Sequence, residues 1–231
     1  MLEITPAEWT AILLSLRVAA VATLVATPLG VALAWLLARR DFWGKSLVDA
    51  LVHLPLVLPP VVTGYLLLLT FGRRGLVGSF LADHLGIVFA FRWTGAALAC
   101  GVMSFPLLVR PIRLSIEAVD QRLEQAAETL GATPWSVFLS VTLPLSLPGV
   151  FAGMVLGFAK AIGEFGATIT FVSNIPGETQ TISSAIYSLI QTPDGDTAAG
   201  RLVVISTVIA MGALIASEWF ARRATKRLHG N

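Results

Sequence analysis

The sequence predicts an all-α integral membrane protein with about five transmembrane helices, and this prediction rests on its composition and its hydropathy pattern. Of the 231 residues, 55% are hydrophobic and only 13% are charged, and the mean hydropathy is +0.79. Soluble domains have about 25% charged residues. The chain therefore has too little polar surface to cover a water-soluble globule, and its length suits a single domain.

Five stretches are long and apolar enough to cross a bilayer, which requires about 20 apolar residues. They cover residues 12–37, 48–71, 93–109, 143–163 and 202–220. The first is interpreted as a retained span, because its apolar run is longer than the hydrophobic region of a typical signal peptide. Long charged side chains near the ends of these stretches can reach the membrane surface, so they do not argue against insertion.

The distribution of lysine and arginine predicts the orientation of the chain, since cytoplasmic loops carry an excess of these residues. If the N-terminus lies outside, ten of the 16 lysines and arginines fall on the cytoplasmic side and four on the outer side. The cytoplasmic ones lie in the first loop, the third loop and the C-terminal tail. This bias predicts an outer N-terminus, a cytoplasmic C-terminus and an odd number of spans.

The third loop is polar but has a helical pattern. Residues 119–130 are rich in Leu, Ala, Glu and Gln, and Gly131 follows as the type of residue that ends a helix. Thr133 and Pro134 are typical of an N-cap and of the first residue of a second helix. Residues 119–141 are therefore expected to form two helices that meet at a glycine on the cytoplasmic face.

The second stretch contains Pro55, Pro59 and Pro60, and prolines remove backbone donors and bend or break helices. Two interpretations stay open: a broken helix beside a transport pathway, or an ordinary kink. The segment 164–201 is too interrupted for a lipid-exposed span. It is expected to lie outside the membrane or to dip back among other helices, with a possible helix at 181–191.

The fourth stretch contains Gly149, Gly153 and Gly157, which are four residues apart and so share one helix face. Small residues at this spacing let another helix approach closely. The pattern predicts a tight helix–helix contact, and it leaves open whether the partner helix belongs to the same subunit.

A motif in the third loop resembles the cytoplasmic signature of ABC importer permeases, which reads Glu-Ala-Ala, three residues, Gly, nine residues, Ile, one residue, Leu-Pro. The residues at the expected intervals are Ala126, Ala127, Gly131, Leu143 and Pro144. Val141 replaces the isoleucine, and Gln125 stands at the glutamate position with Glu124 directly before it. The resemblance implies a type I ABC importer transmembrane domain, in which these residues form a coupling helix that docks on an ATPase.

Three further segments, residues 53–65, 71–75 and 163–179, are similar to molybdate permeases, and the similarity covers nearly the whole chain. It implies a bacterial inner-membrane homodimer that surrounds a molybdate pathway. Two cytoplasmic ATPase subunits would bind ATP and magnesium, and a periplasmic molybdate-binding protein would deliver the anion. Importers of sulfate or tungstate are the alternatives within this class.

Other functional classes find little support in the sequence. Gly44-Lys45-Ser46 resembles the end of a P-loop, but the first glycine that the motif requires would fall at Arg39. We expect no cofactor, no catalytic residue and no nucleic-acid partner for this chain. The histidines are too widely spaced for a metal site. An ion-coupled secondary transporter is disfavoured because the chain shows no paired internal repeats.

Molybdate is a tetrahedral dianion, which hydroxyl and N–H donors can hold without binding it too tightly for release. The predicted pathway residues are those with such donors after the prolines of the second stretch and after the fourth stretch: Thr63, Thr168, Thr170, Ser173 and Asn174. Lys160 and Glu164 are four residues apart and can pair on one helix face. They are predicted either to shape the gate or to form a structural ion pair.

Overall fold

The computed structural model describes the backbone of residues 4–228 and the side chains of residues 4–216, and this part of the chain contains helices but no strands. The prediction of an all-α fold is confirmed. The elements are α1 (Pro6–Arg39), α2 (Lys45–Val57), α3 (Pro60–Phe71), α4 (Leu76–Leu85), α5 (Trp93–Glu117), α6 (Gln121–Thr129), α7 (Pro134–Val137), the π-helical segment η1 (Phe138–Thr142), α8 (Leu143–Ile162), α9 (Gly166–Val172), α10 (Ile182–Leu189) and α11 (Asp196–Leu228).

Four helices within the described residues are long and apolar enough to cross a membrane. They are α1, α5, the continuous helix Pro134–Ile162 and the Asp196–Ala216 part of α11, and the bent pair of α2 and α3 would make a fifth. Helix α5 continues well beyond residue 109, where the apolar stretch ends. Arg113 pairs there with Asp49 of α2 at 2.9 Å and with Glu117 at 2.8 Å, and these ion pairs stabilise the added turns.

The second apolar stretch is a broken helix rather than an ordinary kink. Helices α2 and α3 are bent by 116° at a two-residue break. Leu58 and Pro59 are both extended there, and a residue that precedes a proline is pushed out of the helical region. Pro60 then opens α3 at a position where its missing N–H has no cost.

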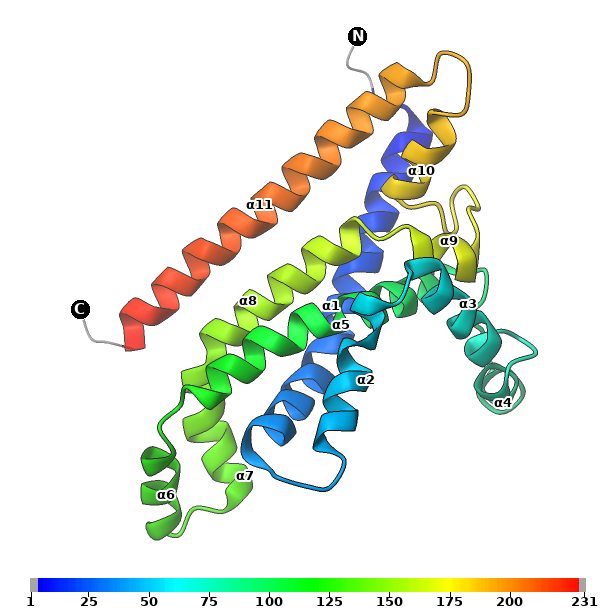
Figure 1. The fold of residues 1–231 in the computed structure, drawn as a ribbon. Coiled ribbons are helices and arrows are strands. Elements are labelled where there is room, and N and C mark those ends of the chain that lie inside the picture. Colours follow the sequence, from blue (N-terminus) through cyan, green and yellow to red (C-terminus); the bar gives the residue numbers. More distant parts are fainter. Residues whose placement is uncertain (1–3, 229–231) are drawn as a thin grey trace.

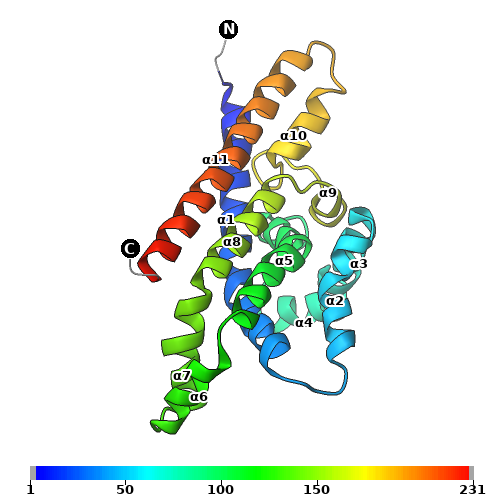
Figure 2. The same ribbon diagram turned by 60° about the vertical axis from the view of Figure 1, so that its left-hand side comes forward.

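Helices α5 and α8 pack closely at the centre of the molecule, α1 lies against both, and α11 runs along α8 (Figures 1 and 2). The glycine face of α8 makes the α5 contact possible. A Cβ atom would lie 2.6 Å from the carbonyl oxygen of Pro111 at Gly149, and 2.5 Å from that of Leu108 at Gly153. At Gly157 it would make only ordinary contact with the Leu108 side chain. The partner helix of the glycine face is thus α5 of the same chain.

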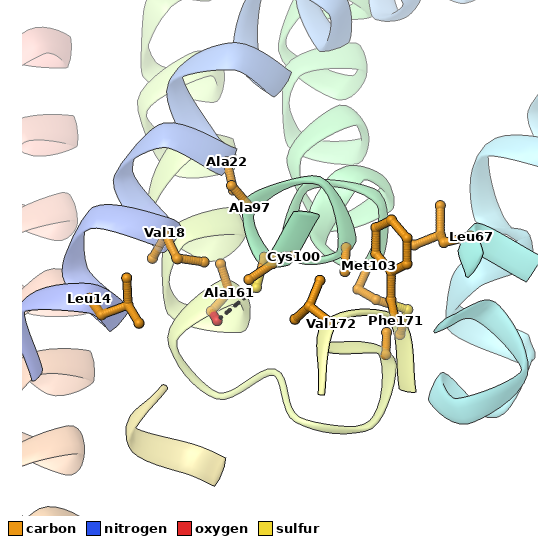
Figure 3. Packing of buried hydrophobic residues seen from close by; sticks show 14 of the residues in the cluster. Leu14, Val18, Ala22, Leu67, Ala97, Cys100, Met103, Ala161, Phe171 and Val172 are labelled. Carbon is orange, nitrogen blue, oxygen red and sulfur yellow. Dashed lines mark hydrogen bonds between the residues drawn. The ribbon is translucent and has the colours of Figure 1, made fainter. Parts of the chain in front are cut away.

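An apolar core joins five of these helices (Figure 3). The Cys100 side chain of α5 lies fully buried in it, and its thiol donates to the carbonyl of Ala161 of α8 at 3.5 Å. Further members come from α1, α3, α5 and α9: Val18, Ala22, Leu67, Met103, Phe171 and Val172. Helix α9 is therefore an inward-facing part of the core, although it has only seven residues.

The two ends of the molecule differ. At one end, α10 and the start of α11 pack on the N-terminal part of α1, where Arg201 donates to Glu8 at 2.8 Å. At the opposite end, α6 and α7 project beyond the long helices (Figures 1 and 2). The polar loop that carries the signature motif is thus well separated from the segment around α10.

Helix α4 was not predicted from the sequence. It begins after Gly75, packs on α3 and ends at Gly86, whose φ of 66° is the left-handed conformation typical of a glycine that follows a helix. The two glycines that bracket an apolar decapeptide were the signal that could have revealed it.

Candidate functional site

The signature motif folds into a helix–turn–helix elbow. Asp120 caps α6 by accepting from the N–H of Arg122 at 2.9 Å. After α6, Gly131 has a φ of 89°, its N–H bonds to Glu128, and the N–H of Ala132 bonds to Ala127. These two bonds are the Schellman arrangement that ends a helix at a left-handed glycine. The chain reverses at Gly131 for this reason.

The second arm of the elbow leads directly into the membrane. Thr133 caps α7 by accepting from the N–H of Ser136 at 3.3 Å, and Pro134 is the first helical residue. Helices α7, η1 and α8 then form one continuous helix, Pro134–Ile162. Any displacement of the elbow is therefore applied directly to a long helix of the membrane domain.

The π-helical turn of η1 ends two residues before Pro144 and was not predicted. Its defining bond runs from the N–H of Leu143 to the carbonyl of Phe138. A proline within a helix lacks an N–H and crowds the carbonyl four residues earlier, here that of Ser140. A wider turn accommodates this conflict without ending the helix. Val141 of the motif lies in this turn, and Leu143 and Pro144 follow it.

The outer surface of the elbow is exposed and carries large apolar side chains among polar ones. Helix α6 buries none of its residues, Gln125 and Ala126 are exposed, and Ala127 is half-buried. Leu130 is 89% exposed and Trp135 is 68% exposed. Large apolar side chains on a polar loop are typical of a surface that another protein covers.

Glu124 differs from its neighbours in α6 because its side chain faces α1 and η1 of the same chain. Its carboxylate accepts hydrogen bonds from Arg39 of α1 at 3.1 Å and from the hydroxyl of Thr142 at 2.5 Å. These groups line a polar cavity of about 310 Å³ between the end of α1 and the elbow. Sequence reasoning missed Arg39 and Thr142 as members of the site.

A second group of polar residues surrounds the start of α9. Lys160 donates to Glu164 at 2.6 Å, so the pair predicted from the four-residue spacing is formed. The other carboxylate oxygen of Glu164 accepts from the N–H of Ala167 at 3.0 Å, which caps α9. The Glu164 side chain is 1% exposed and that of Lys160 is 30% exposed. This carboxylate therefore stabilises the break between α8 and α9, and it leaves the amine of Lys160 partly accessible.

The predicted pathway residues of α9 and its C-terminal end lie close together, and the donors of Thr168, Thr170 and Asn174 bond to groups of the protein itself. The hydroxyls of Thr168 and Thr170 each donate at 2.8 Å to a backbone carbonyl within the α9 segment. Asn174 donates to Ser188 of α10 at 2.7 Å, and Ser173 ends α9 with a φ of 65°. In this conformation these donors stabilise the segment itself.

Thr63 is the exception among these residues. It lies on α3, is 6% exposed, and its hydroxyl has no hydrogen-bond partner among the described residues. The adjacent Gly64 is packed so closely on α9 that a Cβ atom would lie 2.5 Å from the carbonyl oxygen of Ala167. Thr63 therefore brings a buried, uncommitted hydroxyl to the contact of α3 with α9.

A cavity of about 640 Å³ lies between α1, α2 and α5, and its lining is almost wholly apolar. None of the predicted pathway residues lines it. An apolar wall cannot replace the hydration of a dianion. Within the described residues, no group of three or more His, Cys, Asp or Glu side chains could hold a metal ion.

Comparison with known proteins gives a consistent set of relatives. The family model of binding-protein-dependent transport system inner membrane components matches residues 26–229. The molybdenum transport system permease protein ModB of Escherichia coli (strain K12) is 60% identical over 224 residues, which are 97% of this chain and 98% of that protein. The ModB protein of Haemophilus influenzae is 56% identical over 221 residues, 96% of each chain.

The fold also has a counterpart among solved structures. A crystal structure of a bacterial ABC transporter involved in the import of the acidic polysaccharide alginate matches with a TM-score of 0.73. The match has 20% sequence identity and covers 95% of this chain and 80% of that one. At this identity the likeness concerns the fold alone.

Proposed function

The chain belongs to the family of binding-protein-dependent transport system inner membrane components, and from this premise we propose that it is the membrane-spanning permease subunit of an ATP-driven molybdate importer. The observation that carries the proposal is the identity of 60% to a molybdenum permease over nearly the full length of both chains. The multi-pass helical fold and the elbow agree with a transport subunit.

The elbow is assigned the coupling role. Its exposed surface around Gln125, Ala126 and Leu130 would dock on a cytoplasmic ATPase subunit that binds and hydrolyses ATP with magnesium. Two copies of the chain would pair around the pathway, each with its own ATPase, and a periplasmic binding protein would deliver the anion. Closure of the ATPases would then switch the dimer between two packed states.

The pathway is assigned to the contact of α3 with α9. Thr63 contributes an uncommitted hydroxyl, and Lys160 contributes a partly exposed positive charge one turn before the helix break. Thr168, Thr170, Ser173 and Asn174 form the segment whose side chains would exchange hydrogen-bond partners during passage while its backbone keeps its shape. A Lys160→Ala variant with unchanged uptake would remove Lys160 from the gate and leave it a structural partner of Glu164.

The test of the proposed function is ATP-dependent uptake of labelled molybdate into liposomes that hold the permease, the ATPase and the binding protein. We expect uptake to require ATP and to be reduced by unlabelled tungstate more than by sulfate. Accumulation of labelled sulfate in place of molybdate would assign the chain to the sulfate alternative. Uptake driven by an ion gradient without the ATPase would contradict the proposal.

The orientation can be tested with one introduced cysteine, because the native Cys100 is fully buried and should not react. Leu130→Cys places a thiol at the tip of the elbow, where the side chain is 89% exposed. We expect a membrane-impermeant maleimide to label it only in inside-out vesicles. Labelling in intact spheroplasts would place the elbow on the outer face and contradict the coupling role.

A further inference from the structure

Glu124 is the point at which the elbow is held to the rest of the domain. Its two carboxylate oxygens contact Arg39, the closest approach being 3.0 Å from the guanidinium Nε, and one of them also accepts from Thr142 at 2.5 Å. The side chains of Arg39 and Glu124 are only 10% and 15% exposed. Charge-assisted hydrogen bonds of this kind are about twice as strong as neutral ones.

These bonds join α1, which is distant in sequence, to α6 and η1. Arg39 is the last residue of α1 and lies 85 residues before Glu124, and it also donates to the carbonyl of Val119 at 3.1 Å. Thr142 is the last residue of η1 and immediately precedes α8. One carboxylate therefore connects the cytoplasmic end of α1, the first arm of the elbow and the start of α8.

The π-helical turn is what presents Thr142 to the carboxylate. Successive residues of an α-helix are rotated by about 100° around the axis, so the residue that a π turn inserts changes which side chain faces a given neighbour. Thr142 is 1% exposed, whereas the adjacent Val141 is half-buried. The wide turn before Pro144 thus places a hydroxyl, rather than an aliphatic side chain, against Glu124.

We propose that Glu124 is a positioning residue that transmits displacement of the elbow to α1 and α8 together. This inference rests on the proposed function, in which an ATPase subunit moves the elbow. Helix α6 buries no residue, so little apolar packing would carry its motion inward. Without the carboxylate, the covalent connection through Gly131 would still move α7 and α8, but α1 would no longer follow.

The experiment compares molybdate uptake with ATP hydrolysis in liposomes that hold the complete importer. Glu124→Gln removes the charge that Arg39 requires, and Thr142→Val removes one hydroxyl with little change of shape. We expect both variants to keep the ATPase bound and hydrolysing, with uptake per ATP reduced about fivefold or more in Glu124→Gln and by less in Thr142→Val. A purely structural role would instead lower the melting midpoint without changing that ratio.

Two variants serve as matched controls. Thr142→Ser keeps the hydroxyl, and Glu128→Gln removes the same charge from an exposed position of α6. Both should retain the wild-type ratio of uptake to hydrolysis. Equal uncoupling in Glu128→Gln would show that the charge of the elbow matters rather than the Glu124 contact, and would overturn the proposal.

The remaining outcomes are also decisive. A wild-type ratio in Glu124→Gln, or loss of the ATPase from that variant, overturns the proposal, because the residue would then be dispensable or part of the docking surface. If Glu124→Gln does not assemble, the difference between Thr142→Val and Thr142→Ser decides in its place. A wild-type chain that neither binds an ATPase nor takes up molybdate would instead refute the proposed function.

Discussion

Two helix breaks flank the continuous helix Pro134–Ile162, and each break is organised around a glutamate. At the elbow, Glu124 bonds to Arg39 and Thr142, which lie 85 and 18 residues away in sequence. At the start of α9, Glu164 bonds to Lys160 and to the N–H of Ala167, four and three residues away. One carboxylate thus connects distant helices and the other stabilises its own turn.

The surroundings of the two breaks differ in the same way. The elbow exposes most of its side chains, and its glutamate lines a polar cavity. The second break packs on α3 and α5, and the hydroxyls of Thr168 and Thr170 donate to carbonyls of the α9 segment itself. The difference implies that the elbow is built to move together with α1 and α8, whereas the backbone of the α9 segment is built to keep its shape.

The comparison is tested most strongly by Glu164→Ala. The change removes the cap of α9 and leaves the half-buried Lys160 without its partner. Loss of one member of a buried pair costs about 3 kcal/mol or more of unfolding free energy. We expect a large fall in the melting midpoint of the detergent-solubilised protein, measured by fluorescence-detected size-exclusion chromatography after heating.

Glu164→Gln is the matched control for that experiment. The amide keeps an oxygen that accepts from the N–H of Ala167 and loses only the charge, so it should destabilise less than alanine. The corresponding Glu124→Ala change should lower the midpoint less than Glu164→Ala does, because Arg39 would still donate to the carbonyl of Val119 and line a polar cavity. Equal destabilisation at both glutamates would contradict the distinction between a moving and a rigid break.

A second prediction concerns α8, the helix that joins the two breaks. Gly153→Ala adds a Cβ atom 2.5 Å from the carbonyl oxygen of Leu108, so α5 and α8 must separate. Overpacking of this kind costs about 2 kcal/mol. Gly157→Ala is the control, because its Cβ atom would lie 3.5 Å from the Leu108 side chain, an ordinary contact, and alanine favours the helix.

The two glycine variants are to be measured for both stability and uptake. Gly153→Ala should lower the melting midpoint and uptake together, and Gly157→Ala should leave both near the wild-type values. If Gly153→Ala retained wild-type stability while uptake was lost, the α5–α8 contact would be a moving surface rather than a fixed one, and α8 could not act as a rigid connection.

The features that the sequence predicted correctly depend on short-range chemistry. Gly131, Thr133 and Pro134 define the ends of helices through bonds to residues within five positions, and the Lys160–Glu164 pair needs only the period of a helix. The glycine face of α8 was predicted as a contact for the same reason. Which helix it contacts depends on the tertiary arrangement, and no periodicity within α8 contains that information.

The features that were missed depend on distant partners or on geometry. The prolines of the second stretch left a break and an ordinary kink open, and they did not give the angle of 116°. The Glu124–Arg39 pair could not be inferred, because any of the arginines on the predicted cytoplasmic side was an equally good partner for a carboxylate in the third loop. The π-helical turn had a local signal in Pro144, since a proline that follows directly on helical residues has to be accommodated by some irregularity.

The smallest expected effect is that of Gly131→Ala at the elbow. A Cβ atom would meet nothing within 4 Å there, so the change adds only the strain of a non-glycine residue at a φ of 89°, which is about 1 kcal/mol. This strain lowers the fraction of elbows in the docking conformation, and we expect the apparent affinity for the ATPase subunit to fall about fivefold. Gly131→Asn should lose less affinity, because asparagine tolerates the left-handed conformation better than alanine does. Titration of the ATPase against the detergent-solubilised permease would measure both, and equal losses would show that the strain does not govern docking.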